Sequence, residues 1–95
     1  MAHSYEQIIA PHRARMSPEE LQQQAVFEAA YNIAMQVIEL REQHGLTQAE
    51  LAARCGMNQA DISRIERGST SPTVRTLHRI ANALSADLRL VKRAA

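Results

Sequence analysis

Between residues 47 and 68, apolar residues recur at helical spacing on both sides of a glycine. The apolar positions are Leu51, Ala52, Cys55, Ile62 and Ile65. Thr47 followed by Glu50 is the capping-box pattern that starts a helix, and Gly56 supplies the positive φ that a chain leaving a helix needs. Two helices this short cannot bury their apolar faces alone. They must therefore cross steeply and share a third helix beneath them.

A long helical pattern precedes these two helices. Ser17, Pro18 and Glu20 form a helix start, because serine caps, proline accepts the first helical position and glutamate completes a capping box. The helix extends to about His44, which is about 27 residues, or about 40 Å at the rise of an α-helix. No glycine or proline marks a break, although a division near residues 23–27 would leave two helices.

This long helix carries two apolar stripes, whereas a helix packed on a small domain needs one. The first stripe is Val26, Ala30, Ile33, Val37 and Leu40. The second stripe is Phe27, Tyr31, Ala34 and Ile38. A second stripe requires another surface, which is either a folded-back N-terminal segment or a partner protein. The predicted partner interface consists of Val26, Phe27, Tyr31 and Ile38.

The C-terminal part of the chain predicts one more helix and one strand. The helix begins at Thr73, and its apolar residues follow a 3.6-residue period. They are Val74, Leu77, Ile80, Ala81 and Leu84. Residues 86–91 largely alternate polar and apolar, which predicts a short strand. A lone strand must pair with the N-terminal segment, a symmetry mate or a partner's sheet edge.

Composition excludes several classes of protein. The chain has a single Cys, so an internal disulfide is impossible, and its four histidines show no metal-ligand spacing. We therefore expect neither a metal nor a cofactor. No apolar run is long enough for a membrane span and no signal peptide is visible, so we expect a cytoplasmic protein without a membrane partner. No nucleophile–base constellation or phosphate loop is present, so we do not expect an enzyme.

Charge is distributed unevenly along the chain, although the net charge is only +1. Residues 1–44 hold three arginines and six glutamates, a net charge of −3. Residues 45–95 hold eight basic and four acidic residues, a net charge of +4. A basic C-terminal half is typical of a nucleic-acid-binding protein, although such a balance is also ordinary for a soluble domain.

The sequence TQAELA, the turn glycine and the sequence SRIERG resemble the landmarks of the Cro and lambda-repressor (XRE) family. The resemblance implies an all-α fold, a lambda-repressor-like helix-turn-helix bundle, here with a long N-terminal helix and a short C-terminal strand. The second helix of such a motif lies in the DNA major groove, with its N-terminal residues nearest the bases. A homodimer is expected, because one recognition helix covers only a half-site of the operator DNA.

The resemblance also assigns DNA contacts to individual residues. Gln59 and Ala60 occupy the first base-reading positions, where the amide can bond to adenine and the methyl can touch thymine. Ser63 and Arg64 follow one turn later, and Arg64 could fork onto a guanine or equally clamp a phosphate. The phosphate candidates are Gln48, Asn58 and Arg67, with Arg75 as a secondary one. Composition alone would indicate no more than a solvated polar face.

One further pair carries over from the family. An arginine before the glycine–leucine that ends the first helix often forms a salt bridge with a glutamate of the third helix. Arg41 and Glu66 match those two positions. We predict a structural, partly buried ion pair without a catalytic role.

Residues 17–91 as a whole look similar to HigA-type antitoxins. The matching sequences are SPEE, LREQHGLTQAELA, QADISRIERG and SPTVRTLHRIANAL, together with the long helix and the short tail. This implies a transcriptional repressor that is the antitoxin of a toxin–antitoxin module, repressing its own operon and neutralising a RelE/HigB-like endoribonuclease toxin. Many XRE regulators share these features, so the alternative is a free-standing homodimeric regulator without a toxin partner.

These predictions divide the chain into four segments, as suits 95 residues that form one small domain with an extension. Residues 1–16 are a tail or a docking segment, and residues 17–36 are a helical extension. Residues 37–90 are the helix-turn-helix DNA-binding domain, and residues 91–95 are a tail.

Overall fold

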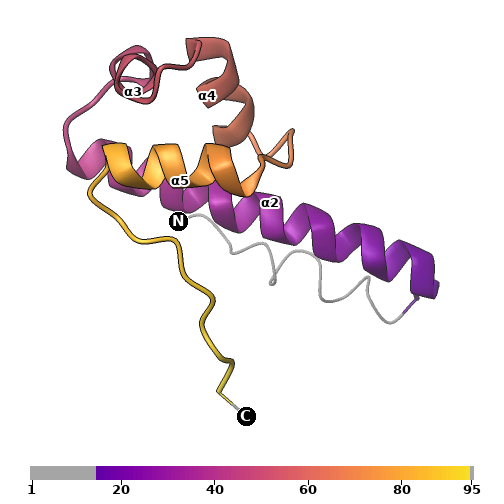
Figure 1. Cartoon of the computed structure of the whole chain (residues 1–95). Helices are drawn as coiled ribbons and strands as arrows, with labels where there is room; N and C mark the ends of the chain where they lie inside the picture. The colour runs from indigo at the N-terminus through magenta and orange to yellow at the C-terminus, as the bar shows by residue number, and fades with distance from the viewer. Residues whose placement is uncertain (1–14, 95) are drawn as a thin grey trace.

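The computed structural model describes residues 15–94 and shows a bundle of α-helices (Figure 1). The helices are α2 Pro18–Gln43, α3 Gln48–Cys55, α4 Gln59–Glu66 and α5 Val74–Ala83. Helix α3 contacts α4 and α5, and α4 also packs on α2. None of these helices combines the length and the apolar character that crossing a membrane requires. The predicted tail or docking segment at residues 1–16 lies almost wholly outside the described residues.

Helices α2, α3 and α5 begin where side-chain oxygens accept bonds from their first-turn N–H groups. At α3, Thr47 Oγ1 accepts from the Glu50 N–H at 3.1 Å, and Glu50 Oε1 accepts from the Thr47 N–H at 3.0 Å. The capping box predicted for α3 is therefore confirmed, whereas at α2 the structure gives only the bond from the Glu20 N–H to the Ser17 hydroxyl. Ser17 and Thr73 cap α2 and α5 through their hydroxyl groups. These local bonds satisfy N–H groups that have no partner within the helix.

The core is aliphatic and draws on all four helices and on the loop before α3. Its buried members are Val37, Leu46, Leu51, Ala52, Cys55, Ile62, Ile65, Ile80 and Leu84. Leu51 and Ile62 are fully buried, so α3 and α4 meet through the apolar faces that the spacing predicted. Burial of such side chains is the main favourable contribution to the stability of a bundle this small.

Helix α2 is continuous through residues 23–27. Its buried apolar residues begin at Ala30, whereas its most exposed large apolar residues lie nearer its N-terminus. Ala34, from the second predicted stripe, is buried, whereas Val26, from the first, is 57% exposed. Phe27 is 60% exposed. The reason is length: α2 has 26 residues, or about 39 Å, and its N-terminal half extends past the other helices (Figure 1).

The strand predicted for the C-terminal part is absent from the described chain. Residues 86–94 form no strand, because the described part of the chain offers no second strand for a ladder. Leu88, Leu90 and Val91 are exposed there. Val74 shares the apolar period of α5 but is 72% exposed, because it lies in the first turn of the helix, ahead of the residues that pack.

Candidate nucleic-acid interface

The turn between α3 and α4 fixes how the second helix is presented. Gly56 adopts φ +65° and ψ +36°, the left-handed conformation that glycine takes at low cost. The Met57 N–H then donates to the Ala52 carbonyl at 2.9 Å. From α5, Arg79 Nη2 donates to the Gly56 carbonyl at 3.3 Å. The turn is thus held from α3 and from α5, and the start of α4 is placed accordingly.

Helix α4 has a buried face and an exposed face. Ile62, Ile65 and Glu66 are buried, whereas Ser63 is half-buried. The exposed residues predicted to contact DNA are Asn58, Gln59, Ala60, Arg64 and Arg67. Side chains of these types can donate to and accept from base edges and phosphates. The structure therefore brings the predicted contact residues together along one edge of α4.

The predicted ion pair lies beneath that helix and joins α2 to α4. Arg41 Nε donates to Glu66 Oε2 at 2.7 Å, and Arg41 Nη2 donates to Oε1 at 2.9 Å. Arg41 Nη1 donates to the Leu46 carbonyl at 2.8 Å. The side chains of Arg41 and Glu66 are 16% and 4% exposed. The hydrogen bond to Glu66 raises the pKa of Arg41 above its ordinary value, although burial opposes this.

Gln48 has a structural role that the sequence did not indicate. Its Nε2 donates to Glu66 Oε1 at 3.0 Å, so the start of α3 is tied to the same carboxylate as α2. This bond could not be predicted from local spacing, because the two residues are 18 positions apart in sequence. A phosphate contact from Gln48 would use its second amide hydrogen or the backbone N–H groups at the start of α3.

Both arginines on the exposed edge of α4 are held by side chains of the same helix. Arg64 Nη1 lies 2.7 Å from Asp61 Oδ1, and Arg67 Nη1 donates to Ser63 Oγ at 2.8 Å. Asp61 was not among the predicted site residues, although an acidic residue three positions before an arginine is a known helical pairing. Asn58, at the N-cap position of α4, makes no capping bond with its side chain.

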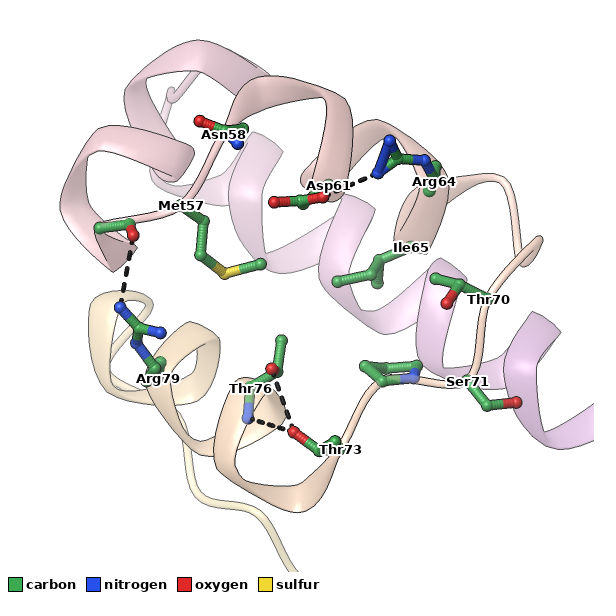
Figure 2. Close-up of a pocket in the computed structure, with 12 residues that line it drawn as sticks. Met57, Asn58, Asp61, Arg64, Ile65, Thr70, Ser71, Thr73, Thr76 and Arg79 are labelled. Atoms are coloured by element: carbon green, nitrogen blue, oxygen red, sulfur yellow. Dashed lines mark hydrogen bonds and ion pairs between the residues drawn. The ribbon is translucent and has the colours of Figure 1, made fainter.

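A hollow of about 430 Å³ lies beside this edge, between α4, the following loop and the start of α5 (Figure 2). Asp61 and Arg64 line it from α4, Thr70 from the loop, and Thr73 and Arg79 from the cap and body of α5. The exposed edge of α4 is therefore bordered on one side by a hollow lined by both polar and apolar side chains (Figure 2).

The other predicted site residues lie away from α4. Arg75 is exposed in the first turn of α5. Of the predicted partner interface, Val26 and Phe27 are exposed, and Tyr31 and Ile38, further along α2, are half-buried. Across residues 15–94, no three His, Cys, Asp or Glu side chains gather as metal ligands would.

Cys55 belongs to the core rather than to the interface. Its Sγ lies 3.9 Å from the Arg79 carbonyl oxygen. Burial raises the pKa of its thiol, so the thiol stays neutral and unreactive at neutral pH.

Comparisons with known proteins agree with this geometry. A helix-turn-helix family model, HTH_3, matches residues 37–91. An uncharacterized HTH-type transcriptional regulator, y4dJ of Sinorhizobium fredii, is 51% identical over 45 residues, which are 47% of this chain and 58% of that protein. Antitoxin HigA1 of Mycobacterium tuberculosis is 41% identical over 64 residues, which are 67% of this chain and 43% of that protein.

A solved structure shows the same fold. The crystal structure of an HTH_3 family transcriptional regulator from Vibrio cholerae matches with a TM-score of 0.63 at 37% identity. The match covers 65% of this chain and 35% of that one. The chain thus spans about half the length, or less, of the proteins it matches.

Proposed function

The chain belongs to the HTH_3 helix-turn-helix family, and we propose that it is a sequence-specific DNA-binding repressor that serves as the antitoxin of a toxin–antitoxin module. In this proposal it represses its own operon as a homodimer. It also neutralises a RelE/HigB-like endoribonuclease toxin.

One observation carries the DNA-binding part of the proposal. The edge of α4 that begins at Gln59 is exposed, while Ile62 and Ile65 on the opposite face are buried against α3 and the rest of the core. A rigid helix with an uncovered polar edge can enter the major groove, because the groove is about 12 Å wide and admits one α-helix. Gln59 and Ala60 at its start would then lie nearest the base edges.

The antitoxin part depends on α2. Val26 and Phe27 are exposed on the half of α2 that projects past the bundle (Figure 1). A helix that exposes large apolar side chains away from its own core is suited to a protein partner. The similarity to antitoxin HigA1 favours a toxin there. The similarity to the regulator y4dJ keeps the alternative, in which α2 forms only the dimer interface of a free-standing regulator.

Binding measurements with two variants test the DNA-binding part. The full-length chain selects duplexes from a random library, and Gln59→Ala should bind the selected duplex about 1–3 kcal/mol more weakly and relax the preference at one base pair. Arg67→Ala is the comparison, because loss of a phosphate contact should weaken binding to all duplexes alike and lower the salt slope by about 1. A uniform loss of affinity in Gln59→Ala would show that Gln59 does not read a base.

A further inference from the structure

Asp61 is a half-buried carboxylate at the border between the exposed edge of α4 and the hollow, and none of the predicted DNA contacts uses it. Its Oδ1 lies 2.7 Å from Arg64 Nη1, and the two side chains are 42% and 52% exposed (Figure 2). An exposed ion pair within one helix contributes little to stability, because water screens it and both side chains lose freedom. Asp61 lies at the border between the proposed DNA-binding edge and the hollow, directly beside Arg64, so its pairing with Arg64 calls for an explanation other than stability.

The second arginine on this edge gives an internal comparison. Arg67 is held by Ser63, a neutral partner, so its positive charge is not compensated within α4. The other carboxylate of α4, that of Glu66, points into the bundle and pairs with Arg41. Of the two arginines on this side of α4, Arg64 is thus the one that is paired with a carboxylate.

We infer that Asp61 is a positioning residue that directs Arg64 to a guanine and away from phosphates, an inference that rests on the proposed function. Arginine presents five N–H donors in a fixed fork. The bond to Asp61 uses Nη1, so enough donors remain for the O6 and N7 acceptors of one guanine.

A phosphate in contact with Arg64 would bring its negative charge next to the Asp61 carboxylate, and the repulsion between them opposes that contact. A guanine edge offers acceptor atoms without a net charge, so it avoids most of this repulsion. Asp61 therefore selects between the two ligands that an arginine at this position can take. Arg67, whose partner is neutral, keeps its full charge for a phosphate.

The test is selection from a random duplex library by the full-length chain and three variants. Asp61→Asn keeps the shape of the side chain and removes its charge, and Arg64→Ala removes the proposed reader. Asp87→Asn is the matched control, because it removes an exposed carboxylate from the C-terminal segment. Circular dichroism and thermal melting establish that each variant is folded, and binding to a random-sequence duplex at several salt concentrations gives the salt slope.

The wild-type chain and Asp87→Asn should enrich a guanine at one position of each half-site. Asp61→Asn and Arg64→Ala should both reduce that preference by about ten-fold or more. In Asp61→Asn the salt slope should steepen by about 1, because Arg64 becomes free to neutralise a phosphate.

If Asp61→Asn kept the guanine preference and merely bound all duplexes more tightly, Asp61 would be an ordinary surface charge and the inference would fail. It would fail equally if Arg64→Ala still enriched the guanine. In both cases the proposed DNA-binding function would stand. A wild-type chain that enriched no sequence would overturn the proposed function itself, and the inference with it.

Discussion

Two glycines share one backbone conformation but differ in what surrounds them. Gly45 and Gly56 have φ of +66° and +65°. A Cβ added at Gly45 would meet no atom within 4 Å, whereas one added at Gly56 would lie 3.0 Å from Arg79 Nη2. Any other residue in this conformation costs about 1–2 kcal/mol.

Gly45→Ala should therefore lower the free energy of unfolding by about 1–2 kcal/mol. Gly56→Ala should lower it by about 1 kcal/mol more, because Arg79 must move and give up its hydrogen bond to the Gly56 carbonyl. Urea unfolding measures both changes. Equal losses in the two variants would show that Arg79 does not help to hold the turn.

The capping box of α3 predicts a dependence of stability on pH. The Thr47 N–H, which donates to Glu50, lowers the pKa of the Glu50 carboxyl, and the Thr47 side chain adds to this. The folded state thus favours the ionised form. The contribution is present above the unfolded pKa of about 4.3 and is lost as the pH falls through the lower folded pKa.

Glu50→Gln should accordingly melt at a lower temperature than the wild type at neutral pH, and the difference should shrink in acid. Melting curves across that range measure it, with Thr47→Ala as the comparison, because that variant keeps the backbone N–H. A difference between wild type and Glu50→Gln that stayed constant with pH would contradict the assignment.

At the residue scale, the sequence predicted what depends on near neighbours in the chain. The bonds between Thr47 and Glu50 and the positive φ of Gly56 are of this kind, because they join positions at most three apart. The bond from Gln48 to Glu66 was not predictable, because it exists only once α3 and α4 have packed together. Asp61 could have been paired with Arg64 from spacing alone, but its place on the exposed edge needed the structure.

At the scale of elements, one ion pair joins three segments of the bundle. Arg41 of α2 binds Glu66 of α4 and the carbonyl of Leu46, while Gln48 of α3 binds the same carboxylate. Arg41 stays protonated at every accessible pH, since its pKa is raised. Removal of Glu66 would therefore leave a partly buried positive charge without its carboxylate partner.

Glu66→Ala should lower the free energy of unfolding by about 3–5 kcal/mol. The double variant Arg41→Met with Glu66→Leu should lose much less, because no buried charge remains. Asp61→Ala is the exposed counterpart and should cost about 0–1 kcal/mol. Chemical denaturation compares the three. A loss from Glu66→Ala no larger than that from Asp61→Ala would mean that the pair does not hold α2 to α4.

The elements themselves were largely predictable, since α2, α3 and α5 start at side-chain caps and all four helices have apolar residues at helical spacing. Which part of α2 is exposed was not predictable. Two apolar stripes indicate that the helix packs against more than one surface, but they do not show how far along the helix the bundle extends. Ala34 of the second stripe is buried and Val26 of the first is exposed for this reason, so neither stripe as a whole faces the core. The short strand at residues 86–91 failed because alternation in sequence cannot supply the second strand of a ladder.

At the scale of the whole molecule, the two proposed binding surfaces lie on different parts of the structure. The edge of α4 lies on the α3–α4 side, and the projecting half of α2 lies past the end of the bundle (Figure 1). The surfaces belong to different helices, so variants can disable one and leave the other intact. The sequence predicted both surfaces, but the identity of a partner for α2 does not follow from the fold.

Val26→Asp combined with Phe27→Asp should disrupt assembly through α2, because two carboxylates would have to enter an apolar contact. The fold should survive, since both side chains are already exposed. Gln22→Asp with Asn32→Asp is the matched control, because it adds the same charge at exposed polar positions of α2. Light scattering of the chain alone, and of the chain mixed with a RelE/HigB-like toxin, gives the assembled mass. A mass unchanged by the Val26 and Phe27 substitutions in both conditions would exclude an interface there.

The most direct test of the account follows the backbone amide signals of the isotopically labelled, full-length chain during titration with its selected duplex. We predict that the largest chemical-shift changes fall on residues 58–64 of α4 and its N-cap and on the start of α3, with residues 18–27 little affected. Largest changes on α2, with the edge of α4 unperturbed, would contradict the claim that this edge reads DNA.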